Sequence, residues 1–105
     1  MVLTRDFKDT VVRRVQKDPE FAQALFDEAV SLFLKGEPEA ARLILRDLVN
    51  ATVGFSRMAR LVHIQNKSVQ RMLSARGNPR MDNLSTIFGA LRRELKISKL
   101  DISVR

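Results

Sequence analysis

The sequence contains no cysteine and a single histidine, His63. Disulfides and thiol chemistry are therefore excluded, and a structural zinc site, which needs several Cys or His ligands, is not expected. No apolar stretch approaches the roughly 18 residues of a membrane-spanning helix, and charges occupy positions 1–10, where a signal peptide would be apolar. We therefore expect a cytoplasmic protein that carries neither a metal nor another cofactor.

Acidic residues are also missing between Asp47 and Asp82, a stretch that contains six Arg or Lys. The net charge of +7 is accordingly uneven: residues 1–50 hold 8 basic and 9 acidic side chains (−1), and residues 51–105 hold 11 and 3 (+8). A basic half beside a neutral half predicts a surface that faces a polyanion. The alternative is a solubilising face, but such faces normally mix both signs.

What the chain does have is helical periodicity, which predicts an all-α fold. Its 105 residues suffice for one domain. Asp18 and Asp82 are predicted to cap helices, Gly36 to end one, and Gly89 to mark a close contact inside another. The expected helices span residues 4–17, 19–35, 38–51, 55–62, 66–74 and 83–95.

The C-terminal residues change their period, since Leu100, Ile102 and Val104 alternate with polar side chains. This alternation predicts a short strand over 99–104, which would need a hydrogen-bonding partner. Whether that partner lies in the same chain, across a dimer or in another protein stays open, as does the alternative of an unpaired tail. We therefore divide residues 1–105, a single domain, into a helical extension (1–36), a helical core that contains the acid-free stretch (37–96) and a C-terminal strand or tail (97–105).

Two short helices are expected inside the acid-free stretch, at 55–62 and 66–74, with a turn over residues 63–65 between them. They should pack through apolar residues at helical spacing: Met58, Ala59, Val62, Ile64, Val69 and Met72. The second helix would then present amide, lysine and arginine side chains on its other face. These groups recognise base edges, so the pair predicts a helix-turn-helix whose second helix enters the major groove. The alternative is a polar face that is merely solvated.

The candidate site residues follow from that geometry. Asn66, Lys67, Gln70 and Arg71 are predicted to read bases. The predicted phosphate contacts are Arg57, Ser74, Arg76 and Arg80. No glycine-rich phosphate loop, carboxylate pair or catalytic triad is present, so no catalytic residue is assigned and an enzyme is not expected.

Residues 46–91 resemble the probable addiction-module antidote proteins, a HigA-like branch of the Xre-type, λ-repressor-like helix-turn-helix regulators. The resemblance is carried by VNATVGF (49–55), KSVQRMLS (67–74), GNP (77–79) and NLSTIF (83–88). LTRDFKDTVVRRV and KDPEFAQALFDEAV are similar to the leader of that family, so nearly the whole chain is covered. The resemblance implies a compact helical DNA-binding domain that represses its own operon. It also implies a partner, a small basic toxin of the RelE/ParE-like class.

Three positions depart from the pattern of the wider family. His63 stands where a glycine is common because φ is positive there, a conformation that histidine tolerates. Gln65 replaces a capping serine, and Phe55 replaces a glutamine that often contacts phosphate.

As partners we expect double-stranded DNA with a palindromic operator, bound by a homodimer, and the basic toxin. The toxin-binding or dimerising surface is expected at 1–36, at 99–104, or at both. The alternative is a protein-interaction or RNA-binding module with a degenerate helix-turn-helix.

Overall fold

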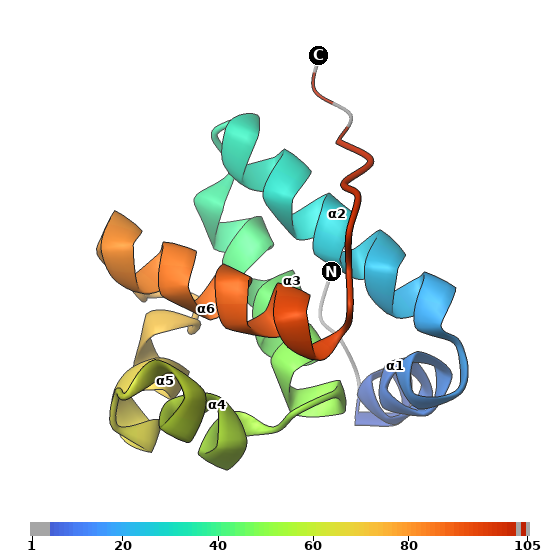
Figure 1. Cartoon of the computed structure of the whole chain (residues 1–105), viewed down its shortest axis with the longest axis horizontal. Coiled ribbons are helices and arrows are strands. Elements are labelled where there is room, and N and C mark those ends of the chain that lie inside the picture. Colours follow the sequence, from blue (N-terminus) through green and yellow to red (C-terminus); the bar gives the residue numbers. More distant parts are fainter. Residues whose placement is uncertain (1–4, 103, 105) are drawn as a thin grey trace.

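A computed structural model describes the backbone of residues 5–102 and 104, and the side chains from Asp9 onward. Thr4, the first residue of a predicted helix, and Ser103, inside the predicted strand, lie outside the described residues. Over the described ranges the fold is all-helical (Figure 1). Its helices are α1 (Arg5–Lys17), α2 (Pro19–Leu34), α3 (Pro38–Ala51), α4 (Phe55–Val62), α5 (Asn66–Met72) and α6 (Met81–Glu94).

The start of α2 follows the sequence signals closely. The Asp18 carboxylate accepts hydrogen bonds from the backbone N–H groups of Glu20 (3.0 Å) and Phe21 (3.4 Å), and the Phe21 N–H also donates to the Asp18 carbonyl (3.1 Å). Pro19 occupies the first turn, where its missing N–H costs nothing. Gly36 has a φ of 80° and follows the end of α2, so its predicted role as a helix stop is confirmed.

The predictions for α6 at Asp82 and Gly89 are wrong. Arg80 takes the extended N-cap conformation, and the Leu84 N–H donates to the Arg80 carbonyl at 3.0 Å, so Asp82 already lies inside the first turn. Gly89 has no close neighbour, because a Cβ there would meet only the end of the Arg93 side chain at 3.5 Å. The acid at position 82 still lies at the favourable end of the helix dipole.

The glycine that is closely packed is Gly77, in the turn between α5 and α6. A Cβ on it would meet the backbone carbonyl oxygens of Met72 and, at 2.6 Å, of Arg71. The last turn of α5 is thus in direct contact with the loop that follows. The helix ends at Met72, two residues before the predicted Ser74, whose N–H donates to the Arg71 carbonyl.

The C-terminal segment is an irregular tail. The prediction of a strand over 99–104 is therefore wrong for the residues of that range that the structure describes, 99–102 and 104. No strand occurs in the described part of the chain, and a lone strand has nothing to pair with. The segment instead runs back along α2 (Figure 1). Ile97 is buried in the core, and the Gln23 amide donates to the Lys99 carbonyl at 2.7 Å.

One cluster of buried side chains draws on all six helices and on Ile97. In α2, Ala22, Phe26 and Ala29 are buried, as its broad apolar surface predicts. The ring of Phe88 on α6 meets those of Phe26 and Phe33 edge to face, with centroids 5.5 and 5.6 Å apart, a favoured aromatic arrangement. The N-terminal helices and the rest of the chain therefore share a core.

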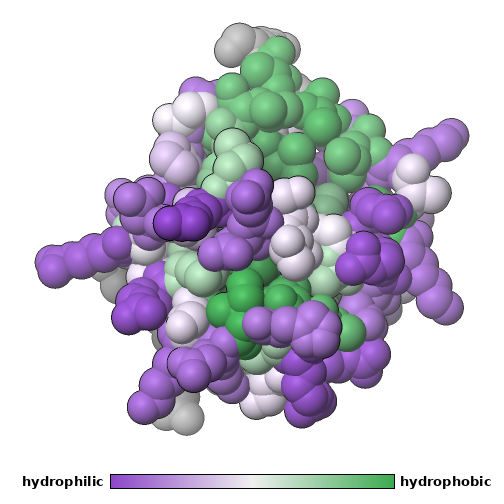
Figure 2. All heavy atoms as spheres, turned by 60° about the vertical axis from the view of Figure 1, so that its left-hand side comes forward, coloured by the Kyte–Doolittle hydropathy of each residue, from purple (hydrophilic) through white to green (hydrophobic). Residues whose placement is uncertain are grey.

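Apolar residues are also left at the surface, in a groove of about 490 Å³ between α2 and α6. We call it the α2–α6 groove. The residues that define it are Val30, Phe33, Leu34, Met81, Phe88 and Leu100. Figure 2 shows apolar side chains gathered at the top of the molecule, where α2 ends and the tail runs in Figure 1.

Candidate nucleic-acid interface

The turn between α4 and α5 adopts the geometry that the sequence requires of it. His63 has φ 58° and ψ 41°, the left-handed conformation, so the prediction of a positive φ here is confirmed. Gln65 takes the N-cap position of α5 without forming a side-chain cap bond. The two helices are thus joined by residues 63–65, with bounds for α4 that match the prediction.

Packing of this pair determines which face of α5 is exposed. Met58 and Val62 of α4 are buried, as are Val69 and Leu73, which lie one helical turn apart. The partly buried Ala59, Ile64 and Met72 pack against the same core cluster, so all six residues predicted to pack face the interior of the fold. Because Val69 and Leu73 face the core, the opposite side of α5 faces solvent.

The exposed side of α5 presents the predicted base-reading residues. Lys67, Gln70 and Arg71 are exposed, and Asn66 is partly buried. The Asn66 amide donates to the Ser56 hydroxyl at 3.1 Å, and the Gln70 amide donates to the Asn66 side-chain oxygen. These bonds orient both amides and tie the first turn of α5 to the first turn of α4.

Four basic side chains on or beside α5 lack an acidic partner. Lys67, Arg71, Arg76 and Arg80 are exposed, and none forms an ion pair with any residue that the structure describes. No acidic residue occurs between Asp47 and Asp82, so α4 and α5 cannot neutralise these charges themselves. All the charged side chains of α4 and α5 are therefore positive, which favours a polyanionic ligand.

Arg57 differs from the other predicted phosphate contacts because its charge is already paired. Its guanidinium donates to both carboxylate oxygens of Glu94 on α6, at 3.0 and 3.1 Å. The Arg57 side chain is 54% exposed, so the ion pair is worth at most about 1 kcal/mol. A phosphate at this position would compete with Glu94.

Ser74 is also engaged within the protein. Its hydroxyl donates to the Arg71 carbonyl at 2.7 Å, which satisfies one of the acceptors left at the end of α5. A phosphate needs a donor, so a contact with Ser74 would have to displace that bond.

Arg42 holds the end of α5 and is a residue that the sequence analysis did not single out. From α3, its Nε donates to the Ser74 carbonyl (3.2 Å) and its Nη2 to the Ala75 carbonyl (3.1 Å). A cation beside these carbonyls also opposes the negative end of the helix dipole. Arg42 lies 32 residues before Ser74, and no local pattern connects the two positions.

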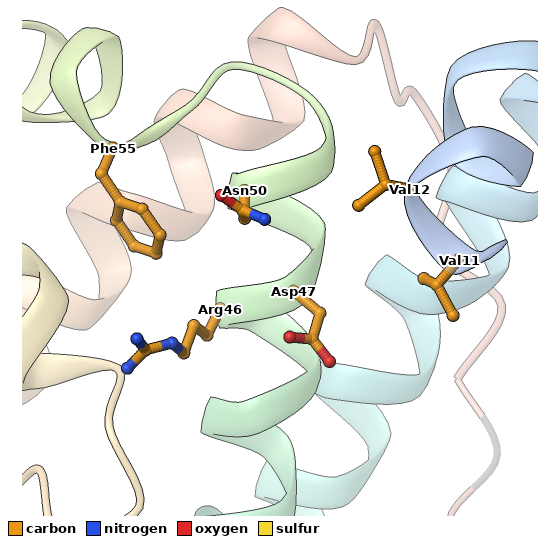
Figure 3. A pocket seen from close by; sticks show the side chains of 6 residues that line it. All are labelled: Val11, Val12, Arg46, Asp47, Asn50 and Phe55. Carbon is orange, nitrogen blue, oxygen red and sulfur yellow. The ribbon is translucent and has the colours of Figure 1, made fainter. Parts of the chain in front are cut away.

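A second missed arginine lies beside the start of α4. The Arg46 guanidinium lies over the Phe55 ring, 5.9 Å from its centroid, a cation–π contact. Both line a pocket of about 160 Å³, in which Arg46 extends toward Phe55 and Asp47 points away from it (Figure 3). Arg46 therefore supplies a positive charge beside Phe55, at the start of α4.

The described residues offer neither a metal site nor a membrane-spanning helix. Among the described residues, no group of three or more His, Asp or Glu side chains is placed to hold a metal ion. None of the helices described is long and apolar enough to cross a membrane. Comparisons with protein-family models, with curated proteins and with solved structures find no match to this chain.

Proposed function

We propose that this protein is a sequence-specific DNA-binding regulator in which α4 and α5 form a helix-turn-helix and α5 enters the major groove. The observation that carries the proposal is the solvent face of α5, where Lys67, Gln70 and Arg71 stand exposed on a surface without acids. Amides pair with adenine edges, and arginine or lysine pairs with guanine. Asn66 joins this face at the first turn of the helix.

The exposed arginines after α5 complete the proposed interface. Arg76 and Arg80 lie in the segment that leads from α5 into α6 and would hold phosphates beside the bases that α5 reads. Arg42 supports them indirectly, because it fixes the end of α5 from which this turn departs. The proposal requires no catalytic residue and no cofactor.

In the cell we propose a cytoplasmic homodimer on a palindromic operator in its own promoter. The resemblance to addiction-module antidotes supports a second role, the neutralisation of a small basic toxin of the RelE/ParE-like class. Because the C-terminal tail forms no strand in the described structure, the N-terminal helices are the better candidate for the toxin-binding surface. They carry exposed acids, among them Asp9 and Glu28, which would attract a basic protein.

Replacement of Arg71 by alanine should weaken binding to the native promoter by about 1–3 kcal/mol and reduce discrimination against altered sites. The side chain is exposed and unpaired in the described structure, so its loss leaves the fold intact. Fluorescence anisotropy with native and scrambled DNA measures both effects. Arg80→Ala should weaken all sequences alike, and Arg13→Ala, an exposed arginine on α1, serves as the charge-matched control. Equal affinities for Arg71→Ala and Arg13→Ala would refute the assignment of α5.

The toxin contact is tested separately from DNA binding. The double variant Asp9→Lys/Glu28→Lys should bind the toxin about 10-fold more weakly, because two attractive charges become repulsive. Co-expression with the product of the neighbouring reading frame measures growth rescue, and promoter binding should stay unchanged. Asp101→Lys, an exposed acid on the tail, is the control. Full growth rescue by the double variant would exclude the N-terminal helices as the toxin-binding surface.

A further inference from the structure

One acidic side chain from outside the acid-free stretch reaches the pair of helices α4 and α5. Glu94, in the last turn of α6, accepts hydrogen bonds from the Arg57 guanidinium with both of its carboxylate oxygens, at 3.0 and 3.1 Å. No other ion pair of α4 or α5 occurs within the described residues. The two residues are 37 positions apart, so it is the fold that brings a carboxylate to this basic surface.

Arg57 lies beside the face that is proposed to read DNA. Its neighbour Ser56 accepts a hydrogen bond from the Asn66 amide at 3.1 Å, which ties the first turn of α4 to the first turn of α5. In a helix-turn-helix, the first helix crosses the phosphate backbone while the second helix enters the groove. A cation in the first turn of α4 is therefore placed to meet a phosphate.

The Glu94 carboxylate offers Arg57 the same kind of partner as a phosphate does. Both are anions with two oxygens that one guanidinium can engage at once, so they compete for the Arg57 side chain. Glu94 is the more enclosed of the two, since its side chain is 26% exposed against 54% for Arg57. When Arg57 turns to DNA, the Glu94 charge stays near the interface without its partner and repels phosphates.

The fold itself gains little from Glu94. A carboxylate in the last turn of a helix lies at the negative end of the helix dipole, which disfavours it. An exposed ion pair adds little to stability. The two helices also share the buried core, to which α4 contributes Met58 and α6 contributes Ile87 and Leu91. The main effect of Glu94 is therefore on the charge of the surface that Arg57 belongs to.

We infer that Glu94 is an internal competitor of DNA, which limits the affinity of the proposed interface by occupying Arg57. The inference rests on the proposed function, and it predicts a gain of binding where the loss of a structural contact would weaken binding. Glu94→Gln keeps the size of the side chain and removes its charge. Affinity for promoter DNA should rise by up to about 5-fold for each protomer and about 25-fold for a dimer (5 × 5), the most that an exposed ion pair provides.

Fluorescence anisotropy of the full chain with promoter DNA and with scrambled DNA of the same length tests the inference. Glu94→Gln should bind both more tightly, because phosphate contacts carry no sequence information. Glu28→Gln is the matched control, since it changes the net charge equally on α2, which lies across the molecule from α4 and α5 in Figure 1. Its affinity should stay close to that of the wild type, because salt screens charges beyond about 10 Å.

A double variant shows whether the gain passes through Arg57. Arg57→Ala/Glu94→Gln should bind DNA as Arg57→Ala does, because the competitor has lost its target. Glu94→Ala, which cannot bond Arg57 at all, should reproduce the gain of Glu94→Gln. Circular dichroism with thermal unfolding verifies that each variant is folded.

Equal affinities of Glu94→Gln and Glu28→Gln would overturn the inference, and so would weaker binding by the folded Glu94 variants, which would assign the pair a structural role. A gain that persists in the double variant would also overturn it, since added positive charge alone would then explain the gain. In each case a wild type that binds the promoter leaves the proposed function standing. A wild type without salt-dependent DNA binding would refute the proposed function and the inference together.

Discussion

An increase in salt from about 50 to 200 mM is expected to weaken binding to the promoter by about 10³-fold. Arg57, Arg76 and Arg80 are the cations proposed to meet phosphates, which makes six contacts in a dimer (2 × 3). Each contact releases condensed counterions, so the logarithm of affinity should fall with the logarithm of salt with a slope of about −5. The prediction depends on the acid-free stretch, because a nearby carboxylate would repel the phosphates.

Anisotropy titrations at four or more salt concentrations measure this slope. Arg80→Ala removes one phosphate contact from each protomer and should make the slope shallower by about 2 units in a dimer. Arg57→Ala should change it less, since the Arg57 guanidinium is already paired with Glu94. A wild-type slope close to zero would exclude a phosphate-dominated interface and favour a protein-interaction module.

Replacement of Gly77 by alanine should destabilise the fold by about 3 kcal/mol. The added methyl group would collide with the carbonyl oxygens of Met72 and Arg71, which belong to the backbone and cannot rotate away as a side chain can. Relief of the clash requires the turn after α5 to move. Because that turn carries Arg76 and leads to Arg80, promoter binding should weaken as well.

Urea denaturation followed by circular dichroism measures the free energy of unfolding. Gly89→Ala provides the control: its new Cβ would meet only the flexible end of Arg93, and alanine is about 1 kcal/mol better than glycine inside a helix. The two glycine variants should therefore change stability in opposite directions. Equal stability of Gly77→Ala and the wild type would show that the turn is loosely packed.

The helix pair at the centre of the proposal was predictable because its signals are local. Gly54 and His63 both take positive φ at the two ends of α4, and the apolar spacing across Met58, Val62 and Val69 fixes the faces. Signals of this kind depend only on residues that are close together in the sequence. The same holds for Asp18, whose carboxylate lies next to the N–H groups that it caps.

The cap predicted at Asp82 and the contact predicted at Gly89 failed locally, whereas other features that the sequence did not reveal depended on partners distant in sequence. The alternation at 99–104 is typical of a strand, but a strand needs another strand, and the described fold contains only helices. Likewise, the bond from Arg42 to Ser74 and the ion pair of Arg57 with Glu94 span 32 and 37 residues. Spacing along a helix carries no information about such pairs, so the partners of individual arginines appeared only in the structure.

The left-handed turn at His63 gives the protein a built-in spectroscopic reporter. The sequence contains no other histidine, and it lacks both tryptophan and tyrosine. The imidazole Hε1 and Hδ2 resonances of a proton NMR spectrum therefore arise from one exposed ring at the junction of α4 and α5. A ligand that reaches this junction shifts those resonances in the unlabelled, unmodified protein, whereas a molecule bound only at the far end of the fold leaves them in place.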